Sequence, residues 1–479
     1  MNRQSIPFSL SIALFVATTL PAQGIDPSPA PFTAGGAVVD ITPAPGISLN
    51  GSISKPGRAA GVHDPLMVRA AVIESGGERV AVAIVDACFL GFPVFETAAR
   101  LVAEATGIPA SHQLVAATHT HAAPRGLSIG RLSELDDTWH AELPLHIADA
   151  IVRADSVREP AQLRAGALSL PELVASRRFH SEPGTVPPNP FGETGETVAS
   201  VFGRGAEKIE AAGPIDPAFG VLYATRPDGS PLLLIGNFGV HYCGGYQGGL
   251  MSADYFGAFC RSLEKKLAGR TGGRPFTALH SNGTSGDIGA LGTPPEMSER
   301  RFAPFEKMAV VGDWLAMRIA AEMDDFSLLA PGAVGGERRV LELGVRRPVA
   351  QRLDWARRVI EEEDAPGNRL PKIYADSAIH LAAYPPTIGI PVQVLRIGRM
   401  RLASTPCEMF AETGLAIKAA RGDAPVFTVS LANGYGGYLP TAEQHNYGGY
   451  ETWAARSSFL EESAEAEIRA TLVEMVKRE

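Results

Sequence analysis

Residues 79–87 read RVAVAIVDA and residues 113–121 read QLVAATHTH, and a helical pattern lies between them. Each of the two runs begins with an apolar stretch that has the length of a buried strand. The helical pattern begins at Pro93, continues to Ala105, and is followed by Gly107, a residue that commonly ends helices. A strand, a helix and a strand in this order form a βαβ unit, which implies a parallel strand pair and a right-handed crossover. The stretch therefore predicts an α/β protein.

Further strands and helices surround this unit along the chain. Hairpins are predicted where two apolar runs are separated by turn residues, and helices where apolar residues recur with helical spacing. The predicted single strands are AGGAVVDITP, FTALH and VFTVSLA. The predicted hairpins are VRAAVIE–RVAVAIVDA, FGVLYAT–PLLLIGNFGV and VQVLRI–MRLAST. The further predicted helices are 254–267, 303–323, 351–363 and 461–476.

Residues 181–213 differ from the rest because Pro, Gly, Ser and Thr dominate and no periodicity holds. A segment of this length and composition predicts a long loop or lid. We find no internal repeat and no composition break that demands a second domain. We therefore expect mixed sheets flanked by helices, in a single catalytic domain over residues 25–479.

The composition narrows the class of protein. Of the 479 residues, 45% are hydrophobic and 20% are charged, as in ordinary globular proteins. Lys and Arg number 43 against 52 Asp and Glu, which gives a net charge of −9. With no basic run, this balance argues against nucleic-acid binding. The four cysteines, at 88, 243, 260 and 407, lack C-x-x-C spacing, so we expect either buried free thiols or one disulfide.

Residues 1–24 are predicted to be a cleavable secretory leader. Arg3 supplies a positive charge, the apolar stretch 7–19 is too short to cross a bilayer, and Ala22-Gln23-Gly24 is a cleavage site of small residues. An uncleaved signal anchor is the alternative. No later stretch has the roughly 18 uninterrupted apolar residues of a transmembrane helix. We therefore expect a secreted or periplasmic protein without a transmembrane segment.

Five apolar runs end in polar residues that can bind ligands. In open α/β sheets, ligands bind beyond the carboxyl ends of the strands, where residues distant in sequence can meet. The five endings are Thr118-His119-Thr120-His121, His241, His280-Ser281-Asn282-Gly283, Pro406-Cys407-Glu408 and Asn433-Gly434-Tyr435.

The histidines among these endings indicate a metal site. His119 and His121 are two residues apart, so on an extended backbone they point to the same side. His119, His241 and Glu408 would provide two imidazoles and a carboxylate, a set that is typical of catalytic zinc and leaves one position for water. Zinc held in this way lowers the pKa of bound water to about 7 and gives a hydroxide nucleophile. The alternative is that each histidine is a hydrogen-bonded structural residue.

Motifs over almost the whole mature chain resemble those of the neutral/alkaline, non-lysosomal ceramidase family, specifically its N-terminal zinc hydrolase domain. We expect no C-terminal immunoglobulin-like domain after the closing helix. The motifs are AGGAVVDITPAPG, GVHDPLMVRA, VAATHTHAAPRG, GNFGVHYCGG, SNGTSGD, STPCEMF and NGYGGYLPTAEQHNYGGYE.

The resemblance implies roles for individual residues. His119, His241, Glu408 and Tyr438 would be the zinc ligands. His121 would lie beside the metal and bind the substrate or the developing oxyanion, or would orient a ligand.

Tyr450 and Arg177 match positions where the family places polar groups near the substrate. Arg178 is the alternative to Arg177, because the flanking residues leave the register open.

The chain also departs from the family pattern. Gly289 stands where family ceramidases carry an active-site serine, and Cys407 stands where a glycine is usual. A hydroxyl from Thr284 or Ser285 could substitute for the serine, although GTSGD reads more simply as a tight turn.

The resemblance implies a secreted zinc-dependent hydrolase that cleaves an amide bond in an N-acyl sphingosine-like or other N-acyl substrate. Because Gly289 lacks the hydroxyl, the alternative is a zinc hydrolase for a non-lipid substrate, such as an acylated sugar or a peptide-like amide. A catalytically inactive, metal-stabilised binding protein is the alternative from another class.

Overall fold

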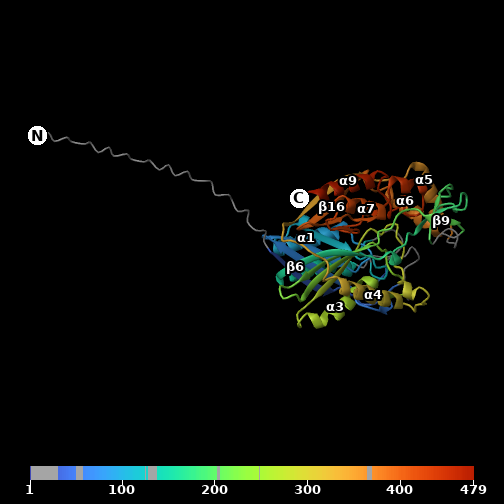
Figure 1. The fold of residues 1–479 in the computed structure, drawn as a ribbon. Coiled ribbons are helices and arrows are strands. Elements are labelled where there is room, and N and C mark those ends of the chain that lie inside the picture. The colour runs from blue at the N-terminus through green and yellow to red at the C-terminus, as the bar shows by residue number, and fades with distance from the viewer. Residues whose placement is uncertain are drawn as a thin grey trace.

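The computed structural model describes Met1 and residues 31–49, 58–124, 126–127, 137–201, 205–246, 249–363 and 369–478. Apart from Met1, the predicted leader, residues 1–24, lies outside the described residues. Mixed sheets flanked by helices make up the fold (Figure 1), so the predicted α/β class is confirmed. Among the helices of the described ranges, none is both long enough and apolar enough to cross a bilayer.

A nine-stranded mixed sheet is the largest sheet of the described residues. Its strands follow the order β13-β11-β10-β6-β1-β3-β4-β5, and β14 also pairs with β6. The pairs β11–β13 and β4–β5 are parallel, and the other pairs are antiparallel. The bounds are β1 Phe32–Asp40, β3 Met67–Ser75, β4 Glu78–Val85, β5 Gln113–Ala117, β6 Glu159–Ser169, β10 Ala218–Thr225, β11 Pro231–Phe238, β13 Thr277–Asn282 and β14 Ser327–Leu328.

A second sheet, of four strands, packs against the inner face of the nine-stranded sheet. Leu114 and Ile235 from the large sheet meet Leu402 and Val429 from the second sheet in one buried apolar cluster. Burial of such side chains stabilises the contact by about 25 cal/mol per Å² of apolar surface removed from water. The second sheet has the order β15-β16-β17-β19, with β15 Val334–Gly344, β16 Thr387–Ile397, β17 Met400–Ser404 and β19 Val426–Val429.

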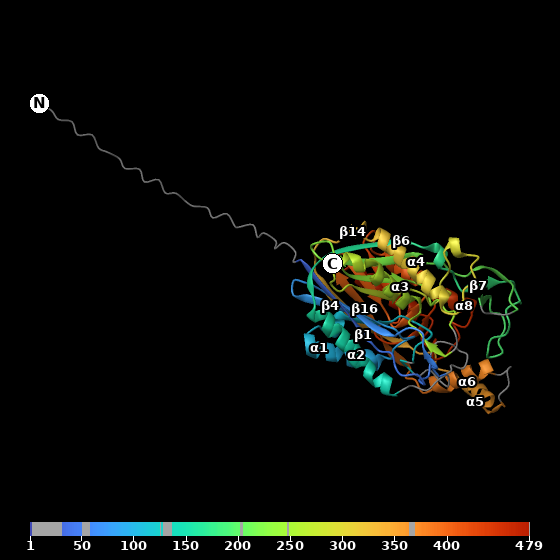
Figure 2. The same cartoon turned by 90° about the horizontal axis from the view of Figure 1, so that it is seen from below.

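Helices cover the outer faces of both sheets. α1 and α2 pack on the β3–β5 end of the large sheet, and α3 and α4 pack on its β10–β13 end. α7 and α9 lie on the opposite side of the strands from α3 and α4 (Figure 1), and Figure 2 shows α1 to α4 from below. The bounds are α1 Phe92–Thr106, α2 Asp137–Ser156, α3 Asp254–Leu267, α4 Glu306–Glu322, α5 Ala350–Glu361, α6 Arg369–Leu381, α7 Ala411–Ala419, α8 Ala442–Tyr447 and α9 Ala464–Lys477.

The predicted βαβ unit is present as β4, α1 and the parallel strand β5. Pro93 lies in the first turn of α1, where its missing N–H costs no hydrogen bond. Gly107 ends the helix in the left-handed region, with φ 78°. Gly76 and Gly77, with φ 64° and 86°, form the two-residue turn between β3 and β4, which requires positive φ at both positions.

The segment 181–213 is more ordered than the predicted loop or lid. In its described part, β8 Val198–Ser200 and β9 Lys208–Ala211 pair with β7 Arg178–Ser181 as a small antiparallel sheet. Strands of three or four residues are too short for an alternation of apolar and polar residues to be recognised in a sequence. The prediction of a long loop or lid was therefore wrong for β8 and β9.

Two short parallel pairs complete the described strands. β2 Gly61–Val62 pairs with β12 Leu250–Met251, and β18 Cys407–Met409 pairs with β20 Gly437–Leu439. All four cysteines are buried and none of them forms a disulfide, which is the first of the two predicted alternatives.

Candidate metal centre

Three of the predicted metal ligands converge in the structure. His119 follows β5, His241 follows β11, and Glu408 lies on β18. All three are buried, with one ligand atom of each within 4.8 Å of the others. His119 Nε2 lies 3.0 Å from His241 Nε2 and 3.5 Å from Glu408 Oε2. Residues from distant parts of the sequence thus present two nitrogens and one oxygen to a common point.

Backbone carbonyls fix which nitrogen of each imidazole faces this point. The Cys88 carbonyl lies 2.8 Å from His119 Nδ1, and the Ser285 carbonyl lies 3.1 Å from His241 Nδ1. A carbonyl only accepts hydrogen bonds, so both Nδ1 atoms donate and both Nε2 atoms of the neutral rings carry a lone pair. Two lone pairs that face each other at 3.0 Å repel, and a cation between them removes the repulsion.

The rings of His119, His121 and His241 are neutral at pH 7 because their pKa values are low. Burial lowers the pKa of His119 to about 4, and burial lowers the pKa of His241 and of His121 well below its ordinary value. The positive charge of Arg177 lowers all three pKa values further. Neutral imidazole is the form that binds a metal, so the histidines are in their ligating state at pH 7.

Glu408 and Tyr438 lie side by side because β18 and β20 pair in register at these two residues. Burial raises the pKa of Glu408 to about 7, and the nearby charge of Arg177 opposes that rise. The Tyr435 hydroxyl donates a hydrogen bond of 3.1 Å to Glu408 Oε1. Glu408 Oε2 is buried without a hydrogen-bond partner. An unsatisfied carboxylate oxygen beside two unprotonated imidazole nitrogens fits a bound metal cation.

His121 also lies at this cluster, but the backbone conformation that brings it there differs from the predicted one. Its Nε2 lies 3.2 Å from His119 Nε2, and its ring stacks on Tyr242 with 4.1 Å between centroids. The backbone of His119 has φ 74° and is left-handed, so the expectation of an extended Thr-His-Thr-His segment was wrong. The two side chains converge because the chain turns at His119 directly after β5.

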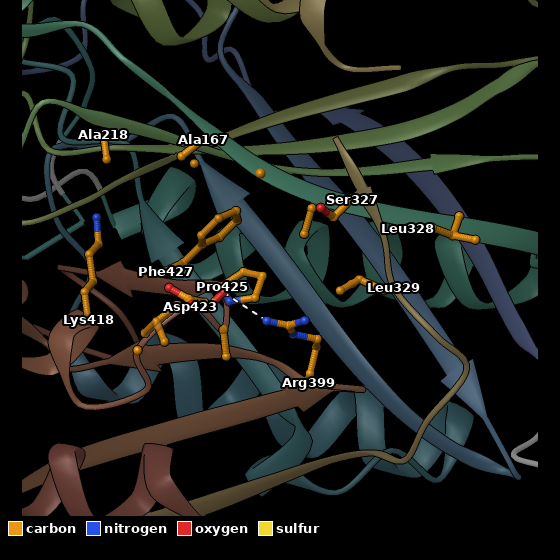
Figure 3. Close-up of a pocket in the computed structure, with 16 residues that line it drawn as sticks. Ala167, Ala218, Ser327, Leu328, Leu329, Arg399, Lys418, Asp423, Pro425 and Phe427 are labelled. Carbon is orange, nitrogen blue, oxygen red and sulfur yellow. Dashed lines mark hydrogen bonds between the residues drawn. The ribbon is translucent and has the colours of Figure 1, made fainter. Parts of the chain in front are cut away.

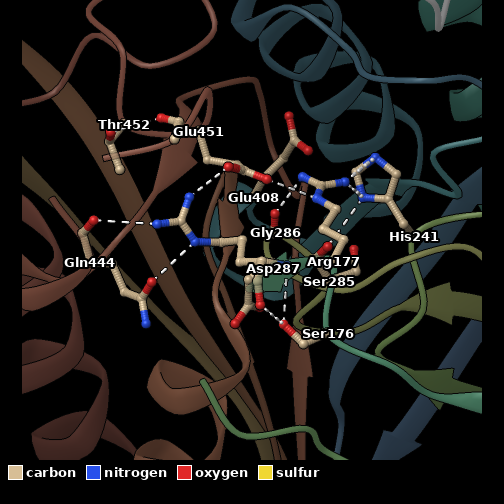
Figure 4. A network of polar contacts seen from close by, with 12 residues as sticks. Ser176, Arg177, His241, Ser285, Gly286, Asp287, Glu408, Gln444, Glu451 and Thr452 are labelled. Atoms are coloured by element: carbon tan, nitrogen blue, oxygen red, sulfur yellow. Dashed lines mark hydrogen bonds and ion pairs between the residues drawn. The ribbon is translucent and has the colours of Figure 1, made fainter. Parts of the chain in front are cut away.

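Of the two candidate arginines, Arg177 contacts the cluster. Its Nη1 lies 3.0 Å from each ring nitrogen of His241 (Figure 4), whereas the Arg178 guanidinium binds Glu451 and Gln444. The Arg177 guanidinium carbon also lies 5.2 Å from the ring centre of Tyr450. Arg177 therefore links the histidines to the loop that carries Tyr450.

Tyr438 and Tyr450 pack against each other and against Arg177. Their ring centres are 5.8 Å apart with the planes nearly perpendicular, and the guanidinium carbon of Arg177 is 5.4 Å from the centre of the Tyr438 ring. Burial raises the pKa of each phenol well above its ordinary value. Both tyrosines are therefore neutral hydroxyl donors at pH 7 in the metal-free protein.

Gly289 lies between the chain segments that carry His241 and Arg177. Its carbonyl accepts from the His241 N–H at 3.4 Å, and its N–H donates to the Ala175 carbonyl at 2.8 Å. A Cβ atom at Gly289 would meet the Ala175 carbonyl oxygen at 3.5 Å and Arg177 Cβ at 3.8 Å, which are ordinary contacts. A serine would thus fit where the hydroxyl of the family pattern is missing.

Thr284 and Ser285 carry the other hydroxyls of this stretch. Thr284 packs against α7 at Gly414, where an added Cβ would meet the Thr284 side chain at 2.5 Å. Ser285 begins a turn in which its carbonyl accepts from the Ile288 N–H at 3.1 Å. The geometry favours the tight-turn interpretation of GTSGD.

Sequence reasoning missed several residues that shape the site. These are Tyr242 beneath His121, the Cys88 and Ser285 carbonyls that fix the two imidazoles, and the Glu451 carboxylate that binds both arginines. Tyr242 and Glu451 each follow a predicted site residue directly in the sequence, which is the signal that could have drawn attention to them. Backbone carbonyls leave no such signal.

A cavity of about 370 Å³ lies elsewhere, between β6, β10 and β14 and the loop that precedes β19 (Figure 3). Small residues such as Gly166 and Gly220 line it, and Arg399 and Lys418 supply its cationic side chains. Lys418 already pairs with Asp216 at 2.5 Å. The candidate metal ligands do not line this cavity, so it is separate from the metal centre.

Comparisons with known proteins agree with this geometry at the level of the fold. No family model matches the chain, and no curated protein sequence matches it. Among solved structures, neutral ceramidase from Pseudomonas aeruginosa matches with a TM-score of 0.69 and 20% identity, over 93% of this chain and 74% of that one. A structure described as ceramidase complexed with C2 matches with a TM-score of 0.67 and 19% identity, over 93% and 75% of the two chains. The predicted resemblance is therefore confirmed in three dimensions: the chain has the fold of neutral ceramidases.

Proposed function

We propose that this chain is a zinc-dependent hydrolase of the neutral ceramidase type, which cleaves the amide bond of an N-acyl sphingosine-like or other N-acyl substrate. The observation that carries the proposal is the cluster of His119, His241 and Glu408, with two neutral imidazole lone pairs and an unpartnered carboxylate oxygen at one point. This donor set is typical of catalytic zinc. The fold similarity to a bacterial neutral ceramidase supports the choice of reaction.

In this proposal His119, His241 and Glu408 hold the zinc ion, and Tyr438 is the fourth protein ligand. A zinc ion in such a set supplies a Lewis acid for the scissile carbonyl and activates water. The Cys88 and Ser285 carbonyls keep the ligating nitrogens of the two imidazoles unprotonated. A hydrogen bond from the other ring nitrogen to a carbonyl raises the basicity of the ligating nitrogen and fixes the orientation of the imidazole.

His121, Tyr450 and Arg177 act on the substrate. His121 Nε2 lies 3.2 Å from His119 Nε2, so His121 borders the proposed ligand His119. Because the His119 lone pair binds the zinc ion in this proposal, a neutral His121 with its proton on Nε2 donates to a substrate oxygen instead. Together with the Tyr450 hydroxyl it would stabilise the developing oxyanion, and the guanidinium of Arg177 would contribute a fixed positive charge.

A hydrolase for a non-lipid N-acyl substrate is the second candidate. The observation in its favour is Gly289, which offers no hydroxyl at the position of the family serine although a side chain would fit there. We also propose that residues 1–24 direct the protein out of the cytoplasm and that residues 25–479 form one catalytic domain. The spread of the candidate site from Cys88 to Glu451 supports a single domain.

Metal analysis of the purified mature chain tests the proposal. The wild type should carry one zinc ion, and His119→Ala and Glu408→Ala should each lose it. His112→Ala is the control, because His112 is partly buried and binds the Arg79 carbonyl outside the cluster, so this variant should keep its zinc. Equal zinc content in all four proteins would refute the site.

Hydrolysis of a panel of N-acyl substrates then tests the reaction. Release of the acyl group from N-acyl sphingosines supports the ceramidase type, and release only from acylated sugars or peptide-like amides supports the second candidate. Zinc at full stoichiometry without hydrolysis of any member would indicate a metal-stabilised binding protein.

A further inference from the structure

Glu451 joins the two arginines beside the metal centre. Its carboxylate is fully buried and lies 3.0 Å from Arg177 Nε (Figure 4). The same carboxylate lies 2.6 Å from Arg178 Nη1. Arg177 and Arg178 are consecutive residues, yet both guanidinium groups return to this one carboxylate. Among the described residues, Glu451 is the only acidic side chain that forms an ion pair with either arginine.

The Arg177 guanidinium is held at two of its three nitrogens. Nε donates to Glu451 Oε1, and Nη2 donates to the Gly286 carbonyl. Because a guanidinium is planar and rigid, two fixed nitrogens determine where the third one points. The third, Nη1, lies against His241. The direction of the Arg177 charge into the centre therefore depends on the position of Glu451.

Arg178 in turn fixes Glu451. Its remaining nitrogens donate to the Gln444 side chain at 3.0 Å and to the Gly448 carbonyl at 2.7 Å. These partners belong to α8 and the residue after it, and they hold Arg178 independently of Arg177. Arg178 is thus an anchor for the carboxylate and has no contact with the histidines.

Charge balance supports the same conclusion. The guanidinium groups of Arg177 and Arg178 and the carboxylate of Glu451 are all buried. The carboxylates of Glu451 and Glu408 both attract the positive charge of Arg177, so this charge is held between Glu451 and the metal centre. A preorganised positive charge of this kind favours a transition state in which an oxyanion develops.

We propose that Glu451 is a positioning residue of the active site, which orients the Arg177 guanidinium toward the metal centre and couples it to the Tyr450 loop. This inference rests on the proposed hydrolase function for its catalytic consequence. Its structural part, the orientation of Arg177, does not depend on the reaction.

The test compares Glu451→Gln with Arg177→Met and with the double variant. If Glu451 acts through Arg177, kcat of Glu451→Gln falls by about 100-fold, the cost of a misplaced catalytic group. The kcat of the double variant should then equal the kcat of Arg177→Met to within about twofold, which is the precision of such double-variant comparisons. Crystal structures of the wild type and Glu451→Gln should show Arg177 Nη1 displaced from His241.

Glu465→Gln is the matched control. Glu465 is also buried and pairs with Arg469 at 2.8 Å. It lies on α9, and its partners Arg469 and Thr413 are not residues of the proposed site. Its loss should lower stability and leave kcat unchanged. If Glu451→Gln does not fold, Glu451→Asp keeps the charge and shortens the side chain by one methylene, and the same fall in kcat and the same displacement are expected.

Three results would overturn the inference: an Arg177 guanidinium that keeps its position in the variant crystal, a folded variant with wild-type kcat, or effects of the two substitutions that multiply in the double variant. A wild-type protein that hydrolyses none of the N-acyl panel would instead refute the proposed function. In that case the crystallographic comparison still decides whether Glu451 positions Arg177.

Discussion

Replacement of His121 by alanine separates catalysis from metal binding at this centre. His121 Nε2 lies 3.2 Å from His119 Nε2; its ligand atoms cluster with those of Cys88 and His119, and not with those of His241 and Glu408, which form the proposed zinc site with His119. His121→Ala should therefore retain zinc and lose a donor to the oxyanion. Loss of one such donor costs about 2.7–4 kcal/mol of transition-state stabilisation, which corresponds to a fall in kcat of about 100- to 1,000-fold.

The substitution also removes the stack of His121 on Tyr242, at 4.1 Å between ring centres. Such aromatic contacts contribute about 0.5–1.5 kcal/mol to stability. Tyr242→Leu is the matched control, because it removes the same stack and keeps the imidazole. Both variants should lose similar stability in urea unfolding, and only His121→Ala should lose two or more orders of magnitude in kcat.

The assay combines zinc content by elemental analysis with kcat on the best N-acyl substrate of the panel. Full turnover of zinc-loaded His121→Ala would refute the assigned role. Loss of zinc from this variant would show instead that His121 is a ligand. An equal fall in kcat for Tyr242→Leu would mean that packing, and not the donor, controls the rate.

Three further substitutions or conditions give independent tests. Gly289→Ser should fold with a free energy of unfolding within about 1 kcal/mol of the wild type, because its Cβ makes ordinary contacts, and should raise kcat/KM for N-acyl sphingosine; a clear loss of stability would contradict the described space. Burial raises the pKa of Glu408 to about 7, so zinc binding should release a proton below pH 7 and weaken as pH falls; calorimetry in two buffers with different ionisation enthalpies measures it, and a binding constant independent of pH would contradict it. Burial lowers the pKa of His280 to about 3, so its contribution to stability is present above pH 6.5 and is lost as pH falls toward 3. His280→Leu should therefore reduce the slope of the unfolding free energy against pH by about 1.4 kcal/mol per pH unit in that window. Parallel curves of unfolding free energy against pH for the variant and the wild type would refute this.

The sequence predicted the local elements with strong patterns. The β4–α1–β5 unit is recognisable because Pro93 and Gly107 mark both helix ends and the strands are apolar throughout. The short strands β7, β8 and β9 were not predicted, since three or four residues carry too little periodicity. How the two large sheets pack on each other also depends on contacts between distant segments, which periodicity does not contain.

The candidate site was predicted at the level of residue type. Histidines and a glutamate at strand ends identified His119, His241 and Glu408 before their distances were known, and the resemblance added Tyr438 and Tyr450. The choice between Arg177 and Arg178 needed the fold, because only the turn into β7 decides which guanidinium faces His241. Carbonyl partners such as Cys88 O could not be predicted, since every residue has a carbonyl.

The candidate ligands belong to different layers of the molecule. His119 and His241 follow strands of the nine-stranded sheet, whereas Glu408 lies on β18, the strand after β17 of the second sheet. A cation shared by these residues would cross-link the two layers and stabilise only the folded chain. Zinc at a hundred times its dissociation constant would then add about 2.7 kcal/mol to the free energy of unfolding. The working lifetime of the folded chain would then follow the supply of that cation.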